Sequence, residues 1–356
     1  MIKRRISKQI SIGDVKIGGN APISVQTMCN TDTRDVKATL NQIKEFEQAG
    51  CDIVRLAVLN KEAAESIKEI VKKSNLPLVA DIHFDYRLAI RCIENGIHAL
   101  RINPGNIGKR EHTEKVVNLA KANNIPIRIG INAGSLEKEL KARTDLTLAE
   151  KMVESAFGHI RILEDMNYDN IKISLKSSDV QTTLEAYRLI AQKVDYPLHV
   201  GVTEAGTLKR GLIKSSVGIG TLLAEGIGDT IRVSLTENPV EEVYAGWEIL
   251  KSLDLRSRGV NFISCPTCGR TQIDLISLAK QVEEKFANLD IPITIATMGC
   301  PVNGPGEASS ADYGIAGAIG EGYIFKKGKI ILSRIPEKDL LNELEKVIMA
   351  DFSEKE

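Results

Sequence analysis

Eight apolar, β-rich runs recur along the chain, and each is followed by a longer stretch with helical periodicity. The runs begin near residues 24, 53, 78, 99, 127, 171, 198 and 230. Eight such repeats over about 250 residues match the length and period of a closed (β/α)8 barrel. An open doubly wound sheet is the alternative. The barrel is favoured because the count is eight and because nearly every run ends in polar or charged residues.

The repeat breaks at the sequence RSRG (256–259). We therefore predict a barrel domain over residues 1–256 and a second domain over residues 257–356. The second segment reads as a strand (260–264), a helix (273–286), a strand (293–298), a glycine-rich loop, two strands (313–318 and 329–333) and a helix (337–349). The predicted fold class is α/β, a (β/α)8 TIM barrel followed by a small α+β domain.

The charges of the chain balance, with 47 acidic and 47 basic residues. This balance gives no support to nucleic acid as a partner, and it means that a local group of cations must hold any bound anion. No apolar stretch has the length of a membrane span, and no secretory signal pattern follows the basic N-terminal residues. We expect a cytoplasmic protein without membrane contact, whose six cysteines are free thiols or metal ligands.

Three cysteines of the second domain form the most informative motif. Cys265 and Cys268 make a Cys-x-x-Cys at the end of one predicted strand, and Cys300 ends another after a gap of 31 residues. Three thiolates at one end of a sheet suit a metal centre. A structural zinc site takes four closed ligands, yet this domain contains no histidine. Three thiolates with one open or oxygen-ligated corner favour a [4Fe–4S] cluster over structural zinc.

Glu307 is the candidate for the fourth corner, because it ends the segment CPVNGPGE (300–307). The glycines and prolines of this segment allow the loop to turn back closely. The alternative is an ordinary exposed loop carboxylate, and the residues alone leave both interpretations open. We interpret the cysteines of the barrel, Cys29, Cys51 and Cys92, as packing residues.

Polar and charged residues follow the predicted barrel strands where the strands end. One such arginine often pairs with a carboxylate of a neighbouring strand. A ring of five cations is hard to explain without an anionic ligand, because unpaired buried cations are costly. A phosphate or diphosphate, held by bidentate guanidinium groups, would balance them. The five cations are Arg55, Arg101, Arg128, Lys176 and Arg232.

Further strand-end residues add acid–base and hydrogen-bonding groups: Asp81 with His83, Asn103, Asn132, and His199 with Glu204. Glu204, in the sequence VTEAG (202–206), is the carboxylate best placed for acid–base chemistry. It could equally be the salt-bridge partner of one arginine. The remaining histidines, among them His159, are interpreted as packing or surface residues.

Taken together, these motifs resemble the 4-hydroxy-3-methylbut-2-enyl diphosphate synthase family over essentially the whole chain. The resemblance rests on VQTM (25–28) with NTDT (30–33), ADIHF (80–84), RINPGN (101–106) and GVTEAG (201–206). The most specific parts are CPTCGR (265–270) and MGCPVNGPGE (298–307).

The resemblance implies an iron–sulfur oxidoreductase of the non-mevalonate isoprenoid pathway. Its reaction would be the reductive ring opening of 2-C-methyl-D-erythritol 2,4-cyclodiphosphate, with electrons from flavodoxin or ferredoxin. Our own hypothesis adds catalytic roles for Glu204, in proton delivery, and for Glu307. The resemblance also implies a homodimer. The implied cluster ligands are Cys265, Cys268, Cys300 and Glu307, and the implied substrate-binding residues are Arg55, Arg128, Asn132, Lys176 and Arg232, to which we add His83 and Asn103.

Two other functions remain open. The first is a non-redox barrel transferase of the pteroate-synthase kind, with a structural zinc site in its small domain. The second is a non-enzymatic cluster carrier that uses the three thiols, although the strand-end cations argue against it.

Overall fold

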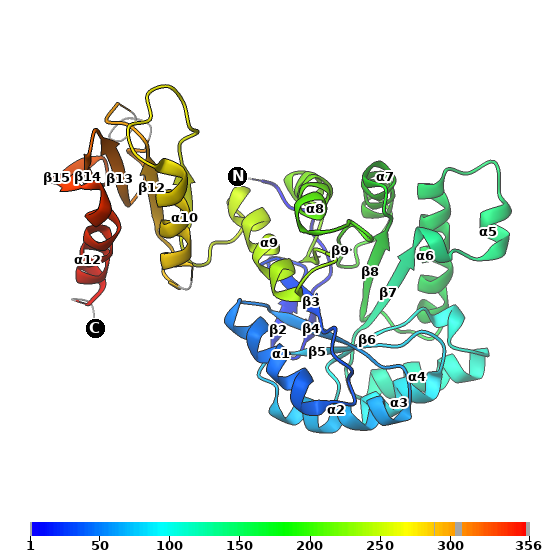
Figure 1. The fold of residues 1–356 in the computed structure, drawn as a ribbon. Helices are drawn as coiled ribbons and strands as arrows, with labels where there is room; N and C mark the ends of the chain where they lie inside the picture. The colour runs from blue at the N-terminus through cyan, green and yellow to red at the C-terminus, as the bar shows by residue number, and fades with distance from the viewer. Residues whose placement is uncertain (1, 288, 303–307, 354–356) are drawn as a thin grey trace. The chain divides into compact units, whose positions relative to one another are not determined.

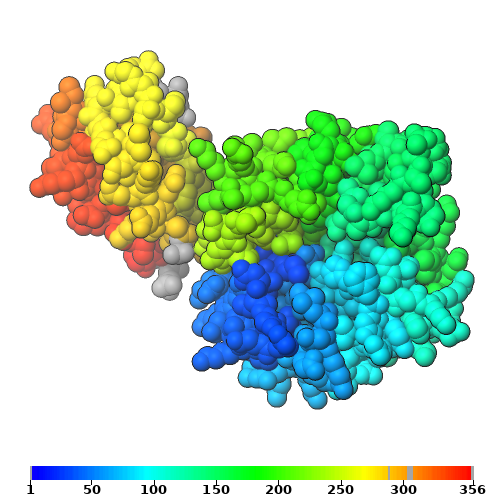
Figure 2. Space-filling model, turned by 45° about the vertical axis from the view of Figure 1, so that its right-hand side comes forward, coloured from blue at the N-terminus to red at the C-terminus, as the bar shows by residue number. Residues whose placement is uncertain are grey.

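The computed structural model describes residues 2–287, 289–302 and 308–353. The chain folds into two compact units, Met1–Arg256 and Ser257–Glu356. In the space-filling view, the residues of the larger unit, coloured from blue to green, form one closely packed body (Figure 2). Among the helices that the structure describes, none is both long enough and apolar enough to cross a membrane.

Eight parallel strands form the barrel of the larger unit, in the spatial order β8-β7-β6-β5-β4-β3-β10-β9. A bridge between Ile173 and Leu198 joins β8 to the segment before β9 and closes the ring. The predicted (β/α)8 barrel is confirmed. Its strands are β3 (Ser24–Met28), β4 (Ile53–Ala57), β5 (Leu78–Asp81), β6 (Ala99–Arg101), β7 (Ile127–Asn132), β8 (Ile171–Lys176), β9 (His199–Val200) and β10 (Thr230–Ile231).

Helices follow the strands and cover the outside of the barrel (Figure 1). Their N-termini carry residues that satisfy the free backbone N–H groups, for example the capping box that Thr147 and Glu150 form at the start of α6. The helices are α1 (Val36–Gln48), α2 (Lys61–Lys73), α3 (Tyr86–Glu94), α4 (Arg110–Ala122), α6 (Leu148–Glu164), α7 (Val180–Ala191), α8 (Leu208–Ala224) and α9 (Pro239–Ser252). Shorter pieces follow β6 and β7: η1 (Pro104–Asn106), η2 (Ala133–Ser135) and α5 (Lys138–Ala142).

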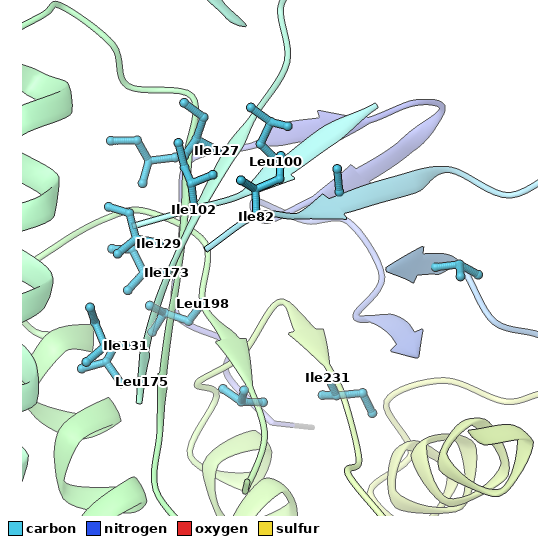
Figure 3. Close-up of a cluster of buried hydrophobic side chains, with 14 of the residues drawn as sticks. Ile82, Leu100, Ile102, Ile127, Ile129, Ile131, Ile173, Leu175, Leu198 and Ile231 are labelled. Atoms are coloured by element: carbon cyan, nitrogen blue, oxygen red, sulfur yellow. The ribbon is translucent and has the colours of Figure 1, made fainter. Parts of the chain in front are cut away.

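Strands β7 and β8 alternate strictly between apolar and polar residues, with the sequences IRIGIN and IKISLK. Successive side chains of a strand point to opposite faces. The apolar set packs with the helices in the main core, and Figure 3 shows Ile131 and Leu175 beside a helix. The polar set, which includes Arg128 and Lys176, therefore faces the barrel interior.

A hairpin of β1 (Ile10–Ile12) and β2 (Val15–Ile17) packs against the N-terminal ends of the barrel strands. Its three isoleucines form a separate apolar cluster with Ile53, Val79 and Ala99. Arg55, Asp81 and Arg101 each lie two positions further along the same strands, and therefore on the same inward face. The interior is thus apolar at the N-terminal end of the strands and charged toward the C-terminal end.

The smaller unit is a five-stranded sheet in the order β11-β12-β13-β14-β15. Strands β11 to β13 are parallel, and β13 to β15 are antiparallel. Its elements are β11 (Asn261–Ser264), α10 (Leu275–Phe286), β12 (Thr294–Met298), β13 (Tyr313–Ala318), β14 (Glu321–Lys326), β15 (Lys329–Pro336), η3 (Glu337–Asp339) and α12 (Leu340–Ser353).

The sequence interpretation of this unit was wrong in one element, because it did not include β14. This strand buries Tyr323, Ile324 and Phe325 in succession, so it lacks the alternation of a strand with one solvent-exposed face. Turns at Gly320 and Gly328, both with positive φ, enclose it closely. A segment of six residues between two glycine turns is predicted to be a loop, because it lacks the apolar–polar alternation by which a strand is recognised.

Candidate functional site

Six cationic side chains come from inward-facing positions on the barrel strands or directly after a strand end. Four of them are at most 7% exposed, and the side chains of the other two are 11% and 16% exposed. They include all five cations that the sequence placed at strand ends. The sixth, Lys172, lies two positions before Ser174 and four before Lys176 on β8, on the same face of the strand. The six are Arg55, Arg101, Arg128, Lys172, Lys176 and Arg232.

Asp81, at the end of β5, is a buried carboxylate among these cations. Its Oδ2 lies 3.4 Å from Nε of Arg55, and its Oδ1 lies 3.2 Å from an Nη of Arg101 and 3.7 Å from Nε2 of His83. Burial by itself would raise the pKa of Asp81, but the attraction of Arg55, Arg101 and Arg128 outweighs it and lowers the pKa. Asp81 is therefore a buried carboxylate that stays ionised.

Glu242, on the buried face of α9, is another buried carboxylate near these cations, and Asp229 attracts Lys172. The two oxygens of Glu242 accept hydrogen bonds from Nε and an Nη of Arg232, at 3.2 and 3.4 Å. They also accept from the hydroxyl of Thr27, at 2.8 Å, and from the backbone N–H of Leu235, at 3.0 Å. These bonds fix the guanidinium of Arg232 just beyond the end of β10.

The other cations are poorly compensated. Arg128 donates one hydrogen bond, to Ser174 Oγ at 3.0 Å, while its Nε and other Nη are buried without a partner. Burial and the repulsion of Arg55 and Arg101 lower its pKa well below the ordinary value. Burial and the repulsion of Arg232, Arg128 and Arg55 do the same for the pKa of Lys176. The barrel interior therefore holds a surplus of positive charge that a bound anion would stabilise.

Two glycines make room for these cations. A Cβ at Gly130 would lie 2.6 Å from Nε of Arg101, whose guanidinium donates to the carbonyl of Gly130 at 3.0 Å. A Cβ at Gly201 would lie 2.5 Å from the backbone carbonyl oxygen of Arg232 and 2.8 Å from Nζ of Lys176. A side chain at either position would displace a cation, and at Gly201 it would also collide with the backbone.

Other predicted site residues lie around the same ends of the strands. The amide of Asn103 is paired with the backbone N–H and C=O of Gly130, at 2.9 and 3.1 Å, so it joins β6 to β7. Asn132 ends β7, opposite Lys176 in the register of β8. The His83 side chain, 52% exposed, lies just after β5.

Glu204 lies in the loop after β9 and is exposed. Its φ of +51° places it in the left-handed region, which is uncommon for residues other than glycine, asparagine and aspartate. Non-glycine residues in this region cluster at functional sites. The backbone N–H of Thr203, one residue earlier, donates to Ser177 O at 3.2 Å and so ties this loop to the end of β8.

His199, the first residue of β9, is fully buried, and both of its ring nitrogens lack partners. Burial and the nearby charges of Lys176, Arg128 and Lys172 lower its pKa well below the ordinary value. The imidazole is therefore neutral among the cations, and it offers one acceptor nitrogen and one N–H donor to a ligand or to water.

In the smaller unit, two of the predicted metal-binding thiols follow neighbouring parallel strands. Cys265 comes directly after β11, and Cys300 lies two residues after β12. The backbone N–H of Gly299 donates to Sγ of Cys265 at 3.1 Å, so the two strand ends are in contact.

Cys268 lies on the turn that leads back from Cys265. The backbone N–H of Thr271 donates to Cys268 O at 3.0 Å, and that of Gln272 donates to Gly299 O at 2.9 Å. The turn is therefore tied to the strand end before Cys300. Hydrogen bonds from Arg270 lower the pKa of the exposed Cys268 thiol.

The chemistry of this donor set fits an iron–sulfur cluster, because three thiols lie on adjoining loops at one end of a parallel pair of strands. Within residues 2–287, 289–302 and 308–353, no three His, Cys, Asp or Glu side chains already lie at metal-binding distances. Glu307, the predicted fourth ligand, lies outside the described residues.

Sequence reasoning missed Lys172 and Glu242. Lys172 had a signal, because it shares the two-residue period of Ser174 and Lys176. Glu242 is an acidic residue among the buried side chains of α9, where Val243, Gly246 and Trp247 lie beside it. A carboxylate on the apolar face of a helix predicts a buried cationic partner.

Comparisons with known proteins fit both units. Residues 7–247 match the GcpE TIM-barrel domain, and residues 261–350 match the GcpE protein C-terminal domain. The chain belongs to the GcpE family. A GcpE-family relative from Clostridium perfringens (strain 13 / Type A), named 4-hydroxy-3-methylbut-2-en-1-yl diphosphate synthase (flavodoxin), is 58% identical over 98% of this chain and 99% of its own length.

A second GcpE-family relative with the same name, from Caldanaerobacter subterraneus subsp. tengcongensis, is 59% identical over 98% of each chain. Among solved structures, dihydropteroate synthase from Stenotrophomonas maltophilia is similar with a TM-score of 0.53 at 12% identity, over 70% of this chain and 98% of that one. At that identity the similarity shows a shared barrel fold and nothing about activity.

Proposed function

We propose that this chain is a 4-hydroxy-3-methylbut-2-en-1-yl diphosphate synthase, the activity for which its relatives are named. The reaction opens the ring of 2-C-methyl-D-erythritol 2,4-cyclodiphosphate with two electrons and two protons, and releases one water. The observation that carries the proposal is the surplus of buried cations at the ends of the barrel strands, since the substrate is a diphosphate.

The substrate diphosphate binds among Arg55, Arg128, Lys176 and Arg232. The unpartnered nitrogens of Arg128 and the crowded ammonium of Lys176 support this assignment, because a diphosphate supplies the missing acceptors and charge. Asp81 and Glu242 hold Arg55 and Arg232 in place. The groups that bind the rest of the substrate are Asn132, Asn103 and His83.

The residues of the smaller unit that would hold a [4Fe–4S] cluster are Cys265, Cys268, Cys300 and Glu307. Such a cluster would supply electrons one at a time. The contact between Cys265 and Gly299 supports the assignment for the three thiols, because it holds two of the ligand-bearing loops together.

Glu204 delivers a proton to the departing hydroxyl of the substrate. Its position in the loop after β9 and its left-handed backbone support this role. Flavodoxin, which the relatives' names include, is the electron donor, and ferredoxin is the alternative. The homodimer and the cytoplasmic location remain predictions from the sequence.

The test is anaerobic turnover of the cyclodiphosphate with reduced flavodoxin, by the wild type and by Glu204→Gln. The matched control is Glu185→Gln, which changes an exposed carboxylate on α7. We expect wild-type turnover, a loss of about 10²-fold or more in kcat for Glu204→Gln, and full activity in the control. Full turnover by Glu204→Gln would remove its assigned role, and an inactive, cluster-loaded wild type would refute the proposed function.

A further inference from the structure

His159, on the buried face of α6, lies between the loops that follow β6 and β7. It is 4% exposed. Its Nδ1 accepts a hydrogen bond of 3.1 Å from the backbone N–H of Gly105, in η1. Its Nε2 lies 3.2 Å from Oε1 of Glu137, which follows η2. One imidazole therefore contacts both loops.

These contacts define the protonation of the ring. A backbone N–H is only a donor, so Nδ1 carries the lone pair and the ring proton is on Nε2, facing Glu137. Nε2 is not aligned on the oxygen as a regular hydrogen bond, so the contact is electrostatic. Glu137 is itself held to α6, because Ser155 Oγ donates to its Oε1 at 3.1 Å.

The loop after β6 is shaped to accept the imidazole. A Cβ at Gly105 would lie 2.9 Å from Cε1 and 3.2 Å from Nδ1 of His159, so any side chain there would displace the ring or the loop. The carbonyl of Pro104 is held from the other side by the hydroxyl of Thr113 on α4, at 3.1 Å. Asn103 is the residue immediately before this anchored segment.

We propose that His159 is a positioning residue, which fixes the loops after β6 and β7 and thereby the site residues that precede them, Asn103 and Asn132. We call the contacts of His159 with Gly105 and Glu137 the clamp. The expected effect on substrate binding rests on the proposed function, whereas the clamp rests only on the contacts above. Asn103 and Asn132 lie two and five residues, respectively, before Gly105 and Glu137, the residues that contact His159. If these loops are loosened, we therefore expect substrate binding to weaken and the rate of the chemical step to stay the same.

Two variants of His159 test its contacts with Gly105 and with Glu137 separately. His159→Asn places an amide oxygen near the position of Nδ1 and keeps an acceptor for Gly105. His159→Gln places its amide near the position of Nε2 and keeps only the group that faces Glu137. A purely space-filling role would give the opposite order of effects, because glutamine is larger than asparagine and leaves the smaller cavity. Gly105→Ala, on an exposed loop, breaks the same contact from the side of the loop and leaves His159 itself unsubstituted.

The experiment measures amide hydrogen exchange of the segment 103–108, without ligand, and KM and kcat for the cyclodiphosphate. For His159→Gln and Gly105→Ala we expect exchange about fivefold faster, the equivalent of one lost hydrogen bond. KM should rise about three- to tenfold with kcat unchanged within about twofold, since only binding is weakened. His159→Asn should remain within about twofold of the wild type in both measurements.

Equal exchange in His159→Asn and His159→Gln would overturn the proposal, and so would faster exchange with an unchanged KM. If His159→Gln fails to fold, Gly105→Ala decides the question with the same two measurements. An inactive wild type would refute the proposed function. The exchange rates alone would then decide whether His159 holds the loop after β6.

Discussion

Arg128→Met is predicted to stabilise the ligand-free barrel while weakening its binding of diphosphate. The variant loses one hydrogen bond, to Ser174, which contributes about 1 kcal/mol. It also removes two buried, unpartnered nitrogens and the repulsion of Arg55 and Arg101. Replacing buried charge by a hydrophobic side chain of similar size is worth about 1–4 kcal/mol, so the net gain is about 0–3 kcal/mol.

The same substitution removes the donors that a diphosphate would use. Each hydrogen bond to a charged group contributes about 1.5–3 kcal/mol, so the affinity for inorganic diphosphate should fall about ten- to hundredfold. Diphosphate at a hundred times its Kd should stabilise the wild type by about 2.7 kcal/mol and the variant much less at that concentration.

The assay is urea unfolding followed by tryptophan fluorescence, combined with calorimetric titration of inorganic diphosphate. Trp247 is the single tryptophan of the chain and is buried in the barrel unit, so its signal reports the barrel alone. Arg188→Met is the control, because Arg188 pairs with Glu225 on the surface and should change stability by no more than about 1 kcal/mol.

The prediction is refuted if Arg128→Met loses more than about 1 kcal/mol of ligand-free stability and binds diphosphate as the wild type does. That result would mean that Arg128 is a compensated structural cation. The surplus of interior charge, on which the substrate site depends, would then be an incorrect interpretation.

Two further predictions concern the buried carboxylates. Glu242→Gln should lower the free energy of unfolding by about 3–5 kcal/mol in the same urea titration, since it leaves Arg232 without its counter-charge. Inorganic diphosphate should restore part of that loss. An unchanged unfolding midpoint would contradict this prediction. Asp81 has a lowered pKa in the folded state, so its contribution to stability is complete above the unfolded-state pKa of about 3.9 and is lost as the pH falls through the folded value. Asp81→Asn should therefore flatten the fall of stability below about pH 4, and equal slopes in the two proteins would rule out this contribution.

The barrel could be predicted from the sequence because its strands carry a strong local signal. In β7 and β8 the alternation of isoleucine or leucine with Arg128, Lys172 and Lys176 indicates one face toward helices and one toward a polar interior. The C-terminal ends of parallel strands meet at one end of a barrel, so the sequence also predicted that the five cations would lie together. Strand β14 was not predicted, because its consecutive buried residues between two glycine turns show no two-residue periodicity.

Which partner each cation has could not be predicted. The contact of Arg55 with Asp81 depends on the register of β4 with β5, where Ala57 lies opposite Asp81, and strand register is not encoded in either segment alone. The pairing of Arg232 with Glu242 joins a strand end to the helix that follows it, at a distance set by the packing of α9. The role of His159 was missed for the same reason, because Gly105 and Glu137 are far from it in sequence.

The most direct test of the central claim is the iron and acid-labile sulfide content per chain after strictly anaerobic purification. Residues of the smaller unit that would bind the cluster are Cys265, Cys268, Cys300 and Glu307, and Cys268→Ser is the matched variant. We predict about four iron and four sulfide per wild-type chain, with a marked loss in the variant. Stoichiometric zinc without sulfide would contradict the reductase and favour a non-redox barrel enzyme.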